Sequence, residues 1–223
     1  MSPLPILAVL PALNEATRIA PVIQKCARVV EKVLVVDDGS TDETAKISLD
    51  AGAQVIQHPQ NRGKGAAIQT AFDAFKKDSL HWLCLLDSDG QHDPEDIPAM
   101  HEMARAGSFD VIVGNRMEET KDMPIVRIAT NRFMSGLLSG MCRQRIPDTQ
   151  CGFRLFSRAV IETLKFTTTH YDLESEMLIQ LARQGFRIGS CRIKTIYGDG
   201  PSHINPIVDT VRFFRLIHRY LAG

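Results

Sequence analysis

The sequence predicts an α/β protein in which helices flank a mostly parallel central sheet. Short apolar runs alternate with helical patterns through the first half of the 223-residue chain, a pattern typical of strand–helix–strand units. The runs are apolar at consecutive positions, as expected for strands that are covered on both faces. Polar residues follow directly after three of the runs, at the edge where an open parallel sheet binds ligands.

Five strands and three helices are expected in the first half. The strands are Ile6–Leu10, Val33–Val36, Gln54–Gln57, Trp82–Leu86 and Val111–Val113. The helices are Thr41–Leu49, Gly65–Phe75 and Pro94–Ala106. Ser40 or Thr41 would cap the first of these helices, which should end near Gly52.

The pattern changes after Arg116. We expect an amphipathic helix over Arg127–Met141, a strand around Phe153, a helix over Ser175–Arg183 and a strand over Ile188–Ile196. No repeat or linker divides the chain, so residues 1–223 are expected to form one domain.

The composition excludes several classes of protein. The 26 basic residues balance the 26 acidic ones, so no overall field is directed at nucleic acid. The five cysteines are scattered without metal-ligand spacing, which argues against a zinc site and for reduced thiols in the cytoplasm. There is no secretory signal, and no run reaches the roughly 18 to 20 apolar residues of a membrane span. We therefore expect a soluble protein or one that lies on a membrane surface.

Polar tips follow the first, second and fourth expected strands. They are Pro11–Glu15, Asp37–Asp42 and Asp87–His92. A carboxylate such as that of Asp38 can accept hydrogen bonds from a ribose hydroxyl or from base N–H groups, and the turn at Gly39 lets a ligand approach the backbone. The alternative is that residues 37–41 only cap the next helix.

Asp87 and Asp89 are two residues apart, so in extended backbone both side chains project to the same side. Together they could hold a hard divalent cation, with Gln91 or His92 supplementing the site. Mg²⁺ or Mn²⁺ is expected, because few protein ligands leave coordination positions for a diphosphate. The alternative is a pair of aspartates in a solvated turn.

Cations occur in segments that flank the expected crevice. The segment Asn61–Gly65 opens a helix with two glycines and two cations, a composition suited to an anion at a helix N-terminus, although an ordinary first turn explains it equally well. Its spacing is not that of a P-loop. Further arginines could clamp phosphates or be ordinary surface charges. They are Arg116, Arg127, Arg132 and Arg154.

Three carboxylates precede or open the helix expected near residue 175. They are Asp172, Glu174 and Glu176. These carboxylates could stabilise the helix through a favourable interaction with its dipole, or one of them could act as a general base. A sugar hydroxyl acceptor would need such a base, whereas a phosphate acceptor would not. The sequence has no HExxH or GxSxG motif, which argues against zinc and serine hydrolases.

These motifs together resemble the inverting glycosyltransferases of family 2, and most closely their dolichyl- and polyprenyl-phosphate mannosyltransferases and glucosyltransferases. The matching segments are Pro11–Glu15, Val35–Asp42, Asn61–Gly65, Leu86–Pro94, Gly114–Arg116 and Asp148–Phe156. The resemblance implies the GT-A fold of nucleotide-diphospho-sugar transferases. It also implies a donor half over residues 1–116, an acceptor half over 117–205 and an amphipathic C-terminal helix over 206–223.

The resemblance also implies roles for individual residues. Those implied to bind the nucleotide sugar are Pro11, Leu13, Glu15, Asp38, Lys64, Asp87 and Ser88. Those implied to hold the metal are Asp87, Asp89 and Gln91, and those implied in catalysis are Asp89, Arg116, Arg132 and Glu174. Those implied to meet an acceptor phosphate are Arg116, Arg132, Arg154, Ser202 and His203. The last pair departs from the family, whose lipid-phosphate enzymes tend to carry Arg and a Ser-Lys pair in this loop.

The implied reaction is transfer of a hexose, with inversion, from GDP-mannose or a UDP-sugar to a polyprenyl or dolichyl phosphate. A sugar hydroxyl of a saccharide or lipid-linked glycan is the alternative acceptor, with Glu174 or Asp172 as base. Sugar-phosphate nucleotidyl transfer and a non-enzymatic nucleotide-sugar scaffold are the remaining alternatives. The sequence leaves the sugar, the base and the oligomeric state open.

Two segments carry both apolar and basic stripes. In Pro206–Leu221 the basic stripe is Arg212, Arg215 and Arg219, and the apolar stripe is Ile207, Val211, Phe214, Ile217 and Leu221. Such a helix can lie on an anionic bilayer or pack on its own domain. The same alternatives hold for Arg127–Met141. We expect a cytoplasmic protein, with these helices as candidates for peripheral contact with the cytoplasmic face of the membrane.

Overall fold

A seven-stranded sheet forms the centre of the protein in a computed structural model, which describes residues 2–120, 123–164, 173–194, 196, 213, 215, 217 and 220. Its strands are β1 (Leu4–Ala12), β2 (Val30–Asp37), β3 (Gln54–Gln57), β4 (Trp82–Leu85), β5 (Val111–Asn115), β6 (Arg154–Ser157) and β7 (Ile188–Arg192). They lie in the order β3-β2-β1-β4-β6-β5-β7. The α/β class predicted from the sequence is therefore confirmed.

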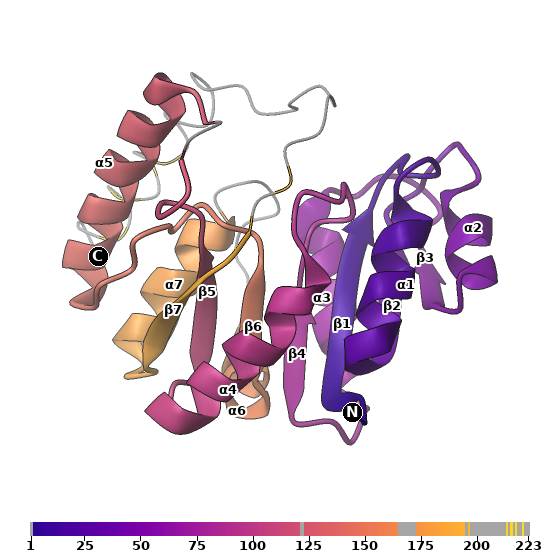
Figure 1. Ribbon diagram of the computed structural model, residues 1–223, viewed down its shortest axis with the longest axis horizontal. Helices are drawn as coiled ribbons and strands as arrows, with labels where there is room; N and C mark the ends of the chain where they lie inside the picture. The colour runs from indigo at the N-terminus through magenta and orange to yellow at the C-terminus, as the bar shows by residue number, and fades with distance from the viewer. Residues whose placement is uncertain are drawn as a thin grey trace.

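The sheet is parallel except at one strand. β1 pairs in parallel with β2 and β4, β2 with β3, and β5 with β7, whereas β6 is antiparallel to both β4 and β5. The carboxyl ends of β1, β2, β4 and β5 therefore share one edge with the start of β6. The polar tips predicted from the sequence lie at this edge (Figure 1).

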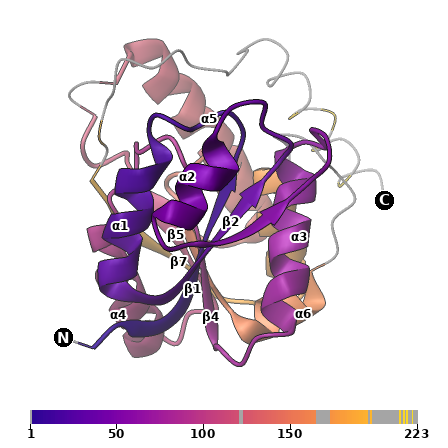
Figure 2. The same cartoon turned by 90° about the vertical axis from the view of Figure 1, so that its right-hand side faces the viewer.

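Helices cover both faces of the sheet. They are α1 (Ile19–Val29), α2 (Thr44–Asp50), α3 (Lys64–Lys76), α4 (Ile97–Gly107), α5 (Ile125–Cys142), α6 (Arg158–Thr163) and α7 (Leu173–Arg183). A 3₁₀ turn, η1 (Pro94–Asp96), leads into α4. Figure 2 shows α1 and α4 on one face and α3 and α6 on the other. α5 packs against α7 at the far end of the sheet from β3.

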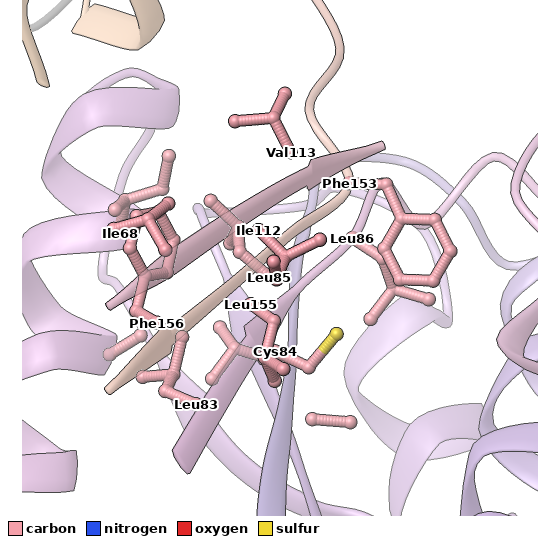
Figure 3. Packing of buried hydrophobic residues seen from close by; sticks show 14 of the residues in the cluster. Ile68, Leu83, Cys84, Leu85, Leu86, Ile112, Val113, Phe153, Leu155 and Phe156 are labelled. Atoms are coloured by element: carbon pink, nitrogen blue, oxygen red, sulfur yellow. The ribbon is translucent and has the colours of Figure 1, made fainter. Parts of the chain in front are cut away.

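The core lies between these layers because the strands are apolar on both faces. Side chains from β4, β5, β6 and α3 interlock in it, and Phe72 meets Phe156 edge to face with ring centroids 5.7 Å apart (Figure 3). Leu83, Ile112 and Leu155 are completely buried. Burial of this kind supplies most of the stability of a small domain.

Two helices were not predicted. α1 begins after Arg18, which makes no side-chain capping hydrogen bond, and it carries Pro21 near its start. α6 is six residues long and follows β6 directly. α1 has no capping residue type at its start, and α6, although it follows Ser157, is too short for a helical period to show in the sequence. The predicted last strand is also shorter, because β7 ends at Arg192.

Part of the predicted C-terminal helix can be placed. Phe213, Arg215, Ile217 and Tyr220 are helical, whereas the rest of residues 206–223 lie outside the described residues. Phe213 and Ile217 are buried in the core, and the guanidinium of Arg183 lies 4.8 Å from the centre of the Tyr220 ring. At these residues the helix packs on its own domain, while Arg215 is exposed.

Candidate active site

The tips of β1 and β4 are joined directly. The hydroxyl of Ser88 donates to the carbonyl of Pro11 at 2.9 Å, and the amide of Leu86 donates to the carbonyl of Val9 at 3.1 Å. Ser88, predicted to bind the nucleotide sugar, is buried. Its hydroxyl therefore fixes the distance between the two strand tips that would receive a donor.

The tips of β1 and β2 are interlocked as well. The side-chain oxygen of Asn14 accepts from the amide of Thr41 at 2.9 Å, and the amide of Asn14 donates to the Ser40 hydroxyl at 2.9 Å. Asn14 has a φ of 56°, a left-handed conformation that asparagine tolerates better than most residues. Leu13 beside it is exposed, and Glu15 forms an ion pair with Arg18 at 2.7 Å.

Asp38 is buried and holds the loop that leads into α3. Its carboxylate accepts from the amides of Arg62 at 3.0 Å and Gly63 at 2.7 Å, and Nδ1 of His58 lies 2.7 Å from it. The neighbouring Gly39 has a φ of 77°, and a Cβ there would come within 2.4 Å of the Gln60 backbone. Asp38 was expected to face a ribose or base, but the structure commits most of its acceptor capacity to this loop.

The capping alternative for residues 37–41 does not describe this segment. Asp37 accepts from the amide of Ser40 at 3.0 Å and from the Gln57 side chain at 3.0 Å. α2 begins later, at Thr44, and the carboxylate of Asp42 accepts from its amide at 3.0 Å. The segment is thus a turn stabilised by its own carboxylates.

Lys64 is the first residue of α3, and it bridges two carboxylates. Its ammonium lies 2.8 Å from Oδ1 of Asp87 and 2.9 Å from Oε1 of Glu174. Burial opposes charge on Lys64, but the two carboxylates outweigh it and raise the pKa of the ammonium above its ordinary value. Burial would likewise raise the pKa of Asp87, yet Lys64 and then His92 hold it far below its usual range. The three side chains therefore form one ion-paired cluster at the carboxyl edge of the sheet.

The predicted metal ligands are found in the turn after β4. The side chain of Asp87 is 32% exposed, and Asp89 and Gln91 are partly exposed. Oδ1 of Asp89 accepts from the amide of Gln91 at 2.9 Å, which tightens the turn. Within the described part of the chain, no three histidine, cysteine or acidic side chains gather as a closed metal cage.

These donors fit Mg²⁺ or Mn²⁺. The two carboxylates and an amide offer oxygen ligands, and a hard cation with few protein ligands keeps positions for water and phosphate oxygens. Asp87 already holds a cation, the Lys64 ammonium. Gly152 faces the other side of the carboxylate, where a Cβ would come within 2.7 Å of Oδ2.

His92 lies beneath Asp87. It is buried, its ring lies 5.2 Å from that of Phe153, and Nε2 is 3.5 Å from Oδ2 of Asp87. Its Nδ1 has no hydrogen-bond partner within the described structure. A buried polar atom without a partner is costly in a finished fold, and this one lies next to the residues predicted to hold a metal.

Arg116 was expected to contact phosphate, but the structure pairs it with a buried carboxylate. Its guanidinium contacts Asp148 through Nε at 2.7 Å and Nη2 at 3.0 Å, and its amide donates to the same carboxylate. Asn131 of α5 donates to Asp148 at 2.8 Å. Asp148 is completely buried, so this network joins the end of β5 to α5.

Arg154 is the first residue of β6 and is completely buried. Its guanidinium donates to the backbone carbonyls of Cys151 at 2.9 Å, Glu174 at 2.8 Å and Thr149 at 2.8 Å. These bonds use donors from all three of its nitrogens. The structure therefore places this arginine as a support for the start of α7 and for the loop before β6, and not among groups that face an acceptor phosphate.

Two of the remaining predicted residues can be placed. Arg132 is exposed on α5, and the carboxylate of Glu174 is nearly buried against Lys64. Ser202, His203 and Asp172 lie outside the described residues. Sequence reasoning gave no role to His58, Asp148 or Gly152. Asp148 and Gly152 lie within a segment that already carried the family resemblance, which was the available signal.

Comparisons with known proteins identify the family of the chain. Residues 7–165 match the family described as Glycosyl transferase family 2. Glycosyltransferase AglD of Haloferax volcanii is 32% identical, and the alignment covers 81% of this chain and 31% of AglD. The UDP-N-acetylglucosamine–dolichyl-phosphate N-acetylglucosaminyltransferase of Methanococcus voltae is 29% identical, with 85% of this chain and 84% of that enzyme covered.

A solved structure shares the fold. It is glucosyl-3-phosphoglycerate synthase from Mycobacterium tuberculosis in complex with Mn²⁺, UDP and glucosyl-3-phosphoglycerate, with a TM-score of 0.72 and 22% identity. The match covers 94% of this chain and 76% of that one. The predicted GT-A fold is therefore confirmed.

We predict that Asp148→Asn destabilises the protein by about 3 to 5 kcal/mol at neutral pH, because it leaves the Arg116 guanidinium buried without a counter-charge. Burial alone would raise the pKa of Asp148, but hydrogen bonds from Arg116 outweigh it and hold the pKa below its ordinary value. The carboxylate therefore stabilises fully above about pH 4, and this stabilisation is lost as the pH falls through the folded-state pKa.

Urea unfolding at several pH values measures both effects. The gap between wild type and Asp148→Asn should shrink as the pH falls below about 4. Glu43→Gln is the control, since Glu43 pairs with Lys46 at the surface, with side chains 67% and 69% exposed, and it should leave the unfolding midpoint unchanged. Equal stability of Asp148→Asn and wild type at neutral pH would contradict the structural role of the pair.

Proposed function

Because the chain belongs to glycosyl transferase family 2, we propose that it transfers a hexose from a nucleotide sugar to a polyprenyl phosphate. The observation that carries the proposal is the charged cluster of Asp87, Lys64 and Glu174 at the carboxyl edge of the sheet. In this proposal the carboxylate of Asp87 would serve a cation and the ammonium of Lys64 would serve a diphosphate. The Methanococcus voltae relative, whose name gives a dolichyl-phosphate acceptor, supports the choice of acceptor.

The donor would lie across the tips of β1, β2 and β4. Leu13 offers an exposed apolar side chain there, which suits the face of a nucleobase. Pro11 and Glu15 flank Leu13 in the sequence. Asp87, Asp89 and Gln91 would hold Mg²⁺ or Mn²⁺, which would neutralise the leaving nucleoside diphosphate. Lys64, at the N-terminus of α3, would add a second positive charge to that leaving group.

The chemistry is a single displacement. An acceptor oxygen forms a bond to the anomeric carbon as the bond from that carbon to the diphosphate oxygen breaks, so the nucleoside diphosphate departs with the bonding electrons and the configuration inverts. A phosphate acceptor is already anionic and gives up no proton. Glu174 is then needed to hold Lys64, which its 2.9 Å contact already does.

Donor binding is the first test. We expect at least one of GDP-mannose, UDP-glucose and UDP-N-acetylglucosamine, with Mn²⁺, to raise the melting temperature, because a ligand that binds only the folded state stabilises it. Asp89→Asn should lower turnover by about a hundredfold or more while nucleotide binding largely persists. Asp73→Asn, in the exposed part of α3, is the control and should behave as wild type. Stabilisation by none of the donors would overturn the proposal.

The acceptor is tested through Glu174→Gln. With a short polyprenyl phosphate we expect kcat to fall less than about tenfold, because no proton has to be removed. If the true acceptor were a sugar hydroxyl and Glu174 its base, the loss would reach about 10² to 10⁴-fold. Assays with both acceptors decide between them, and transfer to a saccharide hydroxyl alone would refute the phosphate acceptor.

α5 offers a surface for the membrane in which a polyprenyl phosphate resides. Ile125 is 83% exposed, Val126 is 77% exposed and Phe133 is 58% exposed, and Arg132 is exposed on the same helix. Apolar side chains beside a cation are what a helix needs to lie in an anionic lipid interface. No helix within the described residues is long and apolar enough to cross a bilayer, and we propose peripheral contact through α5.

Sedimentation with vesicles tests this contact. With vesicles that contain anionic phospholipid, Val126→Ser and Phe133→Ser should each weaken binding about tenfold, because each removes apolar area from the lipid interface. Leu49→Ser is the matched control, since Leu49 is 57% exposed on α2. Equal binding by all the variants and wild type would exclude α5 as the contact.

A further inference from the structure

The Lys64 bridge joins segments that are far apart in the chain. One ammonium at the start of α3 contacts Asp87 after β4 at 2.8 Å and Glu174 in the first turn of α7 at 2.9 Å. The side chain of Glu174 is 9% exposed and that of Lys64 is 28% exposed. The ammonium therefore neutralises two carboxylates that would otherwise face each other.

This bridge conflicts with metal binding at Asp87. Mg²⁺ would bind a carboxylate oxygen at about 2.0 to 2.1 Å, and the oxygen Oδ1 already lies 2.8 Å from the Lys64 ammonium. The other oxygen, Oδ2, lies against Gly152, where a Cβ would come within 2.7 Å of it. It is 3.5 Å from Nε2 of His92. Two cations this close repel each other strongly where solvent screening is weak. The metal and the ammonium therefore compete for Asp87.

The Lys64 side chain can adopt a second position while its backbone stays fixed. The preceding residue, Gly63, has a φ of 92° and donates its amide to Asp38 at 2.7 Å, so the helix start is anchored. From there a flexible four-carbon side chain can turn toward an anion at the N-terminus of α3, where the helix dipole also favours negative charge.

We propose that Lys64 is a built-in counter-cation that occupies Asp87 while the donor site is empty and passes to the diphosphate when metal and nucleotide bind. This inference rests on the proposed function, since it takes a nucleotide and a divalent cation as ligands of this site. Metal alone must displace the ammonium and leave it with Glu174 only. Metal with a nucleoside diphosphate gives the ammonium a new partner, and so the two ligands bind cooperatively.

Mn²⁺ binding to the nucleotide-free protein tests the competition, read from the signal of free Mn²⁺ in electron paramagnetic resonance. We expect Lys64→Met to bind Mn²⁺ about tenfold more tightly than wild type, because the competitor for Asp87 is gone. Adding UDP or GDP should tighten Mn²⁺ binding in wild type by a larger factor than in Lys64→Met. Asp87→Asn should lose tight Mn²⁺ binding in either background.

Lys32→Met is the matched control. Its ammonium lies 2.8 Å from Asp78, and the Lys32 side chain is 33% exposed, so it removes a comparable ion pair from another part of the molecule and should leave Mn²⁺ binding unchanged. Lys64→Gln, which keeps hydrogen-bond donors for both carboxylates, gives the same comparison if Lys64→Met is unstable by thermal unfolding.

The outcomes separate this inference from the proposed function. Mn²⁺ affinity of the Lys64 variants equal to or weaker than that of wild type overturns the counter-cation role, as does the absence of Mn²⁺ binding in every variant. Tighter Mn²⁺ binding in Lys64→Met supports the role even if no polyprenyl phosphate is glycosylated, because the measurement involves no sugar transfer.

Discussion

The ion pairs of Lys64 are the interaction on which the site depends. They connect the start of α3, the turn after β4 and the first turn of α7, three segments that only the strand order brings together. Buried charges are tolerated when they are paired and hydrogen-bonded, and here the pairing decides where two carboxylates lie. The geometry of the proposed donor site is thus set by electrostatics between elements from both halves of the chain.

The rule that a buried charge needs a partner also explains how two arginines can lie inside the fold. Arg116 is neutralised by Asp148, and Arg154 is bound to three backbone carbonyls. Each fixes backbone near the end of β5 or the start of β6, and both guanidinium groups are already paired inside the fold. An isolated buried guanidinium would be costly, and the neighbouring carboxylate and carbonyls remove that cost.

The sequence sufficed for the strands and for the polar tips that follow them, because a strand buried on both faces has a continuous apolar run that is visible locally. The sequence also predicted that Asp87 and Asp89 lie at the carboxyl edge of the sheet. The sequence did not reveal which charged side chains pair with one another. Asp38 and His58 are 20 residues apart and Lys64 and Glu174 are 110 apart, and such pairings depend on how the sheet is assembled. α1 was missed because its start carries no capping residue type, and α6 because six residues are too few for a helical period to show.

The donor and acceptor sides that we propose for the site differ in these contacts. On the donor side, hydrogen bonds among Asn14, Ser40 and Thr41 and the loop held by Asp38 fix the backbone before any ligand arrives, which lowers the entropy that binding must cost. On the acceptor side, Arg116 and Arg154 are already committed, whereas Arg132 is exposed beside the apolar surface of α5. An anionic acceptor that approaches along α5 would therefore meet its positive charge at the helix surface, next to side chains suited to lipid. That arrangement favours an acceptor whose phosphate is attached to a hydrocarbon chain over a fully soluble one.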